Sequence, residues 1–176
     1  MLRSYKGVDW STYLIPNDFQ YLGTHIEPRA WYPMEVFERM GVAILREIAR
    51  NDLKLVQHFG RVSLDALCRE NDNLVAEGDP NESILRFKVL RQSFFDFPAL
   101  EIVDVYEHEA AAIVSYGMGR VAEEAATYQT MGFFERLLER SGGAPVAVAL
   151  QEAGWHGEGR TRIQMAWMLK DAKKRA

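Results

Sequence analysis

The sequence predicts an α+β fold in which N-terminal helices are followed by a ββαββ unit with a four-stranded antiparallel sheet. Residues 33–95 carry apolar side chains at spacings of three and four, which is typical of amphipathic helices. Residues 100–116 and 146–169 instead alternate apolar and polar side chains, which is typical of half-buried strands. One more helical pattern, residues 119–143, lies between these two alternating segments and predicts the central helix of the unit.

The central helical pattern has one face that is apolar except for a glutamine. The face consists of Ala122, Ala126, Gln129, Phe133 and Leu137. Gly132 lies in the helix interior, where glycine costs about 1 kcal/mol relative to alanine, and predicts either close packing against a strand or a local break. A buried Gln129 requires hydrogen-bond partners, and a bond to a sheet edge or neighbouring backbone is favoured over a ligand contact.

Length and charge limit the classes of protein to consider. The 176 residues predict one α+β domain at 31–169, preceded by an irregular lead-in at 1–30 and followed by a basic tail at 170–176. A net charge of −4 provides no broad basic surface for nucleic acid. The sequence has one cysteine, Cys68, which excludes an internal disulfide and a multi-cysteine metal site. Without a 20-residue apolar segment or a signal core, we expect a cytoplasmic protein with no membrane insertion.

The N-terminal half predicts one short strand and four helices. The strand is expected at residues 19–26. Pro33 begins a helix whose apolar stripe runs from Phe37 to Ile48, a second short helix ends near Gly60, and Ser63 caps a third. Asp79 caps the fourth, with Pro80 at its first position. Its apolar residues surround the helix, so we expect it either in the middle of the fold or against a second subunit.

The C-terminal half predicts two hairpins. Residues 100–106 and 110–116 form the first, with a polar turn at residues 107–109. Residues 146–151 and 160–169 form the second. In the last strand one set of alternating residues is expected to face the core: Thr161, Ile163, Met165, Trp167 and Leu169.

Three pieces of the sequence resemble known families: GTHIEPRAWYP at 23–33, AEEAATYQTMGFFERLLERSGG at 122–143, and Trp167. Together they resemble an uncharacterised bacterial domain that is expanded in fruiting myxobacteria. The order of elements is more distantly similar to the vinyl-reductase-like and haem-nitric-oxide-binding domains. The resemblance implies a small-molecule sensor or a dimeric interaction module, and no catalytic residues.

Two departures from those families argue against their cofactors. The haem-binding relatives use a proximal histidine and a Tyr-x-Ser-x-Arg motif, and this sequence contains no Tyr-x-Ser-x-Arg. The cysteine-rich metal site of some vinyl-reductase-like domains cannot form with Cys68 alone. We therefore expect no haem and no other cofactor.

Residues 117–122, GMGRVA, match the G-x-G-x-x-G/A dinucleotide pattern between a predicted strand and a helix, with Glu152 ending a later strand. In such a site the glycines let the backbone approach a pyrophosphate. After Glu152, however, too few residues remain for the βα units of a parallel sheet. A glycine-rich route from strand to helix is the favoured interpretation.

The remaining candidates are few. The histidines His25, His58, His108 and His156 lack metal-ligand spacing, so we expect no metal site. Trp31, Tyr32 and Trp155 are weak candidates for ligand or partner binding because aromatics with polar tips are enriched at interfaces, and Gln129 is a fourth. Packing roles remain the simpler interpretation of all four.

Three hypotheses about function follow. The first is a non-enzymatic signalling or protein-interaction domain that forms a homodimer, because the helices carry excess apolar surface. The second is a sensor that binds a small apolar ligand between helices and sheet. The third, a nucleotide-binding enzyme, depends on the Gly117–Gly119 turn alone.

Overall fold

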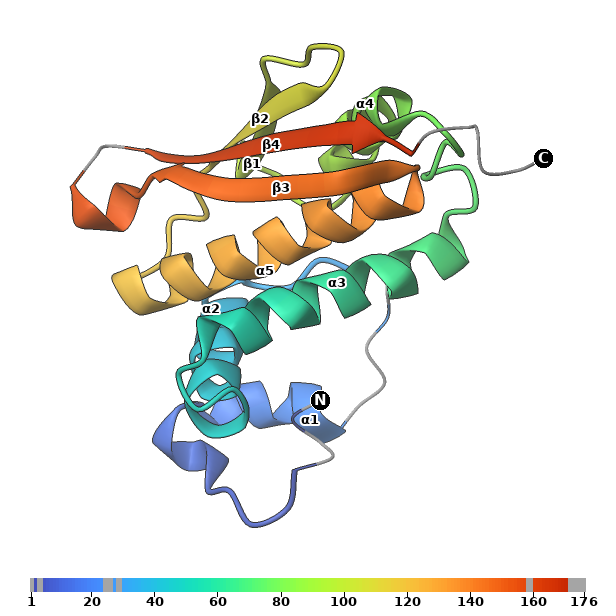
Figure 1. Cartoon of the computed structure of the whole chain (residues 1–176). Coiled ribbons are helices and arrows are strands. Elements are labelled where there is room, and N and C mark those ends of the chain that lie inside the picture. Colours follow the sequence, from blue (N-terminus) through green and yellow to red (C-terminus); the bar gives the residue numbers. More distant parts are fainter. Residues whose placement is uncertain (1, 3–4, 24–26, 28–29, 158–159, 171–176) are drawn as a thin grey trace.

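A computed structural model describes residues 2, 5–23, 27, 30–157 and 160–170. The helices are α1 (Gln20–Gly23), α2 (Met34–Ala43), α3 (Leu53–Glu70), α4 (Pro80–Leu90) and α5 (Arg120–Arg140). The strands are β1 (Leu100–Val103), β2 (Glu109–Val114), β3 (Gly143–Glu152) and β4 (Thr161–Leu169). Figure 1 shows the sheet as the outer layer, α5 beneath it and α3 beneath α5.

The sheet confirms the predicted fold class. Its strand order is β1-β2-β4-β3, and all three pairings are antiparallel. On β4 the predicted alternation holds, because Thr161, Ile163, Met165 and Trp167 are buried. Leu169, at the end of the strand, is exposed. The buried face is covered by α5, so the sheet keeps one solvent-facing side, as antiparallel sheets commonly do.

The main core lies between the sheet and helices α4 and α5. Phe134, Leu137 and Leu138 of α5 have no exposed surface. Phe87 of α4 meets Phe134 edge to face, with ring centroids 5.4 Å apart. Full burial of each such side chain stabilises the fold by about 1.5–3 kcal/mol, so Phe87 contributes directly to the attachment of α4.

Helices α3 and α5 touch backbone to backbone at two glycines. A β-carbon added to Gly60 would lie 1.8 Å from the carbonyl oxygen of Gln129, and one added to Gly132 would lie 1.7 Å from that of Gln57. Gly132 is therefore closely packed, but against a helix and not against a strand. The prediction that a helix ends at Gly60 was wrong, because α3 is continuous.

Ser63 was predicted to cap a helix, and this too was wrong. It lies inside α3, where its hydroxyl donates to the carbonyl oxygen of Phe59 at 2.9 Å. The N-cap of α3 is Asp52, whose carboxylate accepts from the backbone N–H of Lys54 at 2.8 Å. One N-cap thus serves the whole of α3.

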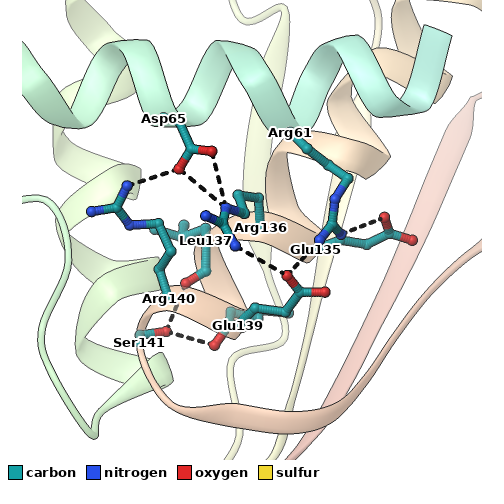
Figure 2. A network of polar contacts seen from close by, with 9 residues as sticks. Arg61, Asp65, Glu135, Arg136, Leu137, Glu139, Arg140 and Ser141 are labelled. Carbon is teal, nitrogen blue, oxygen red and sulfur yellow. Dashed lines mark hydrogen bonds and ion pairs between the residues drawn. The ribbon is translucent and has the colours of Figure 1, made fainter. Parts of the chain in front are cut away.

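A network of ion pairs also joins α3 to α5 (Figure 2). Asp65 accepts from Nη1 of Arg140 at 2.8 Å and from Nε of Arg136 at 3.1 Å. One turn earlier on α3, Arg61 donates to Glu135 and Glu139 of α5. The two helices are therefore held together along the same side over successive turns.

The lead-in contains helical turns where a strand was predicted. The 3₁₀ turn η3 (Pro16–Phe19) and α1 occupy residues 16–23, so that strand prediction was wrong for residues 19–23, and residues 24–26 lie outside the described part. Pro16 suits the first position of a helical turn, and the Asp18 carboxylate accepts from the N–H of Ile15 at 3.1 Å. Asp18 also accepts two bonds from Arg39 of α2, at 2.6 and 2.9 Å, which joins the lead-in to the helices.

Helix α4 begins as predicted, with the Asp79 carboxylate accepting from the N–H of Glu82 at 2.9 Å. Only one side of the helix is buried. Ile84 and Phe87 face the core, whereas Leu85 is 44% and Val89 71% exposed. The helix therefore does not lie in the middle of the fold, and its outer apolar side is uncovered in the single chain.

Candidate functional site: joined apolar pockets

An apolar pocket of about 620 Å³ lies between α1, α2, α3 and α5. Its walls are mainly aliphatic or thioether side chains, including Leu22, Met40, Ile44, Val56, Val62 and Met118. Ile44 begins η4 (Ile44–Ile48), a π-helical turn that continues α2. We call this space the main pocket.

A second, smaller pocket of about 150 Å³ adjoins it. The two share Phe37, Ser63, Ala126 and Gln129, so they meet where α2, α3 and α5 come together. The small pocket is largely aromatic, with Phe87, Phe94, Phe95, Tyr116 and Phe133 in its walls. Leu100 of β1 also lines it, so the small pocket lies between helices and sheet, as hypothesised, whereas the main pocket lies between helices.

Polar groups in the main pocket are few. The Glu38 carboxylate accepts from the backbone N–H of Gly119 at 2.9 Å. Nε2 of Gln129 lies 3.5 Å from Oγ of Ser63, near the limit of a hydrogen bond. Gln129 is partly exposed at the junction of the pockets and not buried, and its partner is a side chain of α3 and not the expected sheet edge or neighbouring backbone.

The small pocket contains one buried polar pair. The Tyr116 hydroxyl lies 2.6 Å from Oγ1 of Thr130, which donates to the carbonyl oxygen of Ala126 at 2.9 Å. Burial raises the pKa of Tyr116 to about 12, so its phenol stays neutral at physiological pH. Both hydroxyls are hydrogen-bonded inside the protein.

The glycine turn before α5 binds carboxylates of the protein itself. Glu123 accepts from the backbone N–H groups of Tyr116 and Met118, at 2.8 and 3.0 Å, and Glu38 accepts from that of Gly119. The amides that a pyrophosphate would require are therefore occupied. The described sheet is also antiparallel throughout, so it lacks the parallel strands that a dinucleotide site at this glycine turn requires.

The four candidate residues from the sequence lie in three places. Gln129 lines both pockets. Tyr32 packs edge to face on Tyr21, a residue of the main pocket wall, at 5.6 Å, and Trp31 beside it is 62% exposed. Trp155 lies apart, in a polar pocket of about 290 Å³ next to the start of α5. The structure thus associates Gln129 directly, and Tyr32 through Tyr21, with the apolar pockets.

Sequence reasoning missed most of the pocket wall. Phe37 and Met40 were assigned to an apolar helical stripe, but Phe37 is half-exposed and both line the main pocket. Gly41, inside α2, also lines the main pocket. A β-carbon added there would have no atom within 4 Å, so this glycine marks unfilled space beside a helix.

Histidines are absent from the described lining of both pockets. His58, His108 and His156 are exposed, and His25 lies outside the described residues. Within the described ranges, no three His, Cys, Asp or Glu side chains gather as a metal would need. No helix of the described chain combines the length and hydrophobicity needed to cross a bilayer.

Comparison with known protein families gives no match, and no curated protein is similar in sequence. Solved structures do match. One, from a study of haem distortion in the H-NOX family, shares 11% identity with a TM-score of 0.57, covering 88% of this chain and 84% of its own. Another, a mutant H-NOX of T. tengcongensis, shares 12% identity with a TM-score of 0.57, covering 88% of this chain and 86% of its own. This chain therefore has an H-NOX-like fold.

The residues present do not fit haem. The described lining of the two apolar pockets contains neither the histidine that the haem-binding relatives use to bind iron nor an arginine or lysine to pair with propionates. Tyr116, Met118 and Arg120 approach the Tyr-x-Ser-x-Arg pattern, with methionine in place of serine. Tyr116 lines the small pocket and Met118 the main pocket, whereas Arg120 lines the separate polar pocket.

Proposed function

We propose that this protein is a non-enzymatic sensor domain that binds a small, mostly apolar ligand directly, without haem. The observation that carries the proposal is the pair of joined apolar pockets between α2, α3 and α5. Ligand sites are typically concave, apolar and about 300–1,000 Å³, with a few polar groups for orientation. The main pocket has that size and composition.

The fold supports the same proposal. H-NOX structures are linked to haem by the work that describes them, and the groups that this sequence resembles are small-molecule sensors or dimeric interaction modules. This chain offers apolar space among its helices but different side chains around it. We infer that the space is occupied by the ligand itself.

A chain-length series tests the proposal. The protein is titrated with 1-alkanols from hexanol to decanol, and binding is followed by calorimetry and by the thermal unfolding midpoint. Burial of each added methylene strengthens binding by about 0.8 kcal/mol, so Kd should fall about fourfold per carbon. Native mass spectrometry of the purified protein would also detect a retained ligand.

A pocket-filling variant provides the control. Gly41→Leu places a side chain into open space beside the main pocket and raises helix propensity by about 1 kcal/mol. We expect it to weaken alkanol binding at least tenfold while the unliganded protein unfolds at an equal or higher temperature. Absence of binding to wild type, or equal affinity in both proteins, would contradict a ligand in this pocket.

We propose, as a second candidate, a cytoplasmic interaction domain that forms a homodimer or binds a protein partner through α4. Leu85 and Val89 support it, because apolar side chains on one helix side are uncovered. Light scattering at micromolar concentration should then show a dimer that Val89→Glu dissociates. A monomeric wild type that also retains no protein partner would exclude it.

We also propose membership of the myxobacterial family, carried by residues 23–33 and 122–143 and by Trp167. Alignment of related bacterial sequences tests this: the residues buried at the α3–α5 crossing, above all Gly60 and Gly132, should be kept. Substitution of these glycines by larger residues in the family would separate this chain from it.

A further inference from the structure

The head group of the ligand is set by the charge and hydrogen-bonding capacity of the pocket walls. Building on the function proposed above, we propose that the ligand is an uncharged aliphatic molecule with a hydroxyl group. That hydroxyl binds Gln129 and Ser63 where the two pockets join.

Charge excludes an acidic head group. Among the described residues that line the two pockets, Glu38 is the single charged side chain, and arginine and lysine are absent. A carboxylate or phosphate would enter without a cationic partner and would be repelled by Glu38. Removing such a group from water without a partner is strongly unfavourable. Fatty acids and other anionic amphiphiles are therefore poor ligands.

Hydrogen-bonding capacity at the junction favours a hydroxyl. Ser63 already donates its proton to Phe59, so its oxygen can only accept. The Gln129 amide can both donate and accept, and its contact with Ser63 is long, at 3.5 Å. A hydroxyl placed there accepts from the Gln129 N–H and donates to Ser63 or to the Gln129 oxygen. A carboxylate only accepts and an ammonium only donates, so neither replaces the long contact as completely.

The other polar pair near the pockets is already satisfied. Tyr116 and Thr130 bond to each other at 2.6 Å, and Thr130 donates to Ala126. Both hydroxyl protons are therefore in use, and the aromatic walls around them suit an apolar group. This places the hydroxyl of the ligand at the junction and its hydrocarbon in the pockets.

Probes that differ only in the head group test the inference: 1-decanol, its methyl ether, decanoate and decylamine, each titrated by calorimetry at pH 8. We expect 1-decanol to bind at least tenfold more tightly than the ether, which accepts but cannot donate, and more tightly than the two ions. Gln129→Leu should weaken decanol binding at least tenfold and weaken the ether less, because the ether loses the N–H donor alone. Gln92→Leu, an exposed glutamine outside both pockets, is the matched control and should change neither.

The outcomes separate this inference from the proposed function. If decanol and the ether bind wild type equally, if decanoate or decylamine binds best, or if Gln129→Leu binds decanol as tightly as wild type does, the hydroxyl assignment is wrong. The apolar pocket remains in each of these cases. If none of the probes binds, both proposals are wrong. Unchanged circular dichroism and thermal unfolding of Gln129→Leu distinguish loss of binding from loss of the fold.

Discussion

Asp65 shows how single residues hold the helical layers together. Burial raises the pKa of its carboxyl group, but the hydrogen bonds from Arg140 and Arg136 outweigh burial, so the pKa is lowered below its ordinary value. The contribution to stability is therefore present above about pH 4, the unfolded pKa, and is lost as pH falls through the folded pKa.

We expect Asp65→Asn to lower the free energy of unfolding by about 1 kcal/mol at pH 7, a modest value because the side chain is 32% exposed. Urea denaturation at pH 7, 5, 3 and 2 measures it, and the difference from wild type should shrink to zero towards pH 2. Asp72→Asn, in an exposed loop with no described ion pair, is the control. A difference that grew on acidification would refute the role of the charge.

At the residue scale, the sequence predicted which side chains form hydrogen bonds better than it predicted their partners. Gln129 was correctly singled out as a polar residue on an apolar face, yet its neighbour is Ser63, 66 positions away. Asp79 was predicted correctly because a capping carboxylate and the backbone N–H that donates to it lie three residues apart. Local hydrogen bonds follow from local sequence, whereas the partner of Gln129 depends on how α3 packs on α5.

At the scale of elements, the crossing of α3 and α5 depends on two glycines, Gly60 and Gly132, whose lack of a side chain lets the backbones touch. Gly60→Ala or Gly132→Ala would place a methyl group within 2 Å of a backbone carbonyl, which cannot be relieved by a side-chain rotation. We expect each to destabilise the protein by about 3 kcal/mol, the upper range for overpacking. Equilibrium urea denaturation measures this change.

Gly41→Ala is the matched control for those variants. It too lies inside a helix, but the added methyl meets no atom within 4 Å. It should therefore stabilise the protein by up to about 1 kcal/mol through helix propensity alone. If all three substitutions had the same effect, the close approach of α3 and α5 would not be what requires glycine.

The same glycines explain which elements could be predicted. The hairpins and α5 have long periodic patterns, so their type followed from sequence, and their antiparallel pairing followed from the short connection between β1 and β2. Gly60 was taken as the end of a helix, because a glycine that stops a helix and one that lets another backbone approach look alike in sequence. The two uses differ only in what packs against the glycine.

At the scale of the whole molecule, the pockets could not be predicted. Their walls combine Leu22, Met40, Val62 and Gln129, which come from four helices. From sequence, the apolar stripe of each helix is expected to be covered by neighbouring elements. Only the packed structure shows which parts of these stripes stay uncovered and line a pocket. The fold class was predictable because it depends on element order, while the candidate site depends on the space left between elements.

The whole fold also leads to a prediction about haem. Although the fold is H-NOX-like, the described pocket walls contain no iron-binding histidine or cysteine and carry one charge, that of Glu38, which opposes the negative propionates. We therefore expect titration with hemin to give no saturable, one-to-one change in the haem absorption band and no rise in the unfolding midpoint. A haem-free H-NOX protein treated identically should show both.

Weak adsorption of hemin would be the same in wild type and Gly41→Leu, because the latter alters the main pocket alone. A stoichiometric complex that Gly41→Leu abolishes would show that haem itself is the ligand and would overturn direct binding of an apolar molecule.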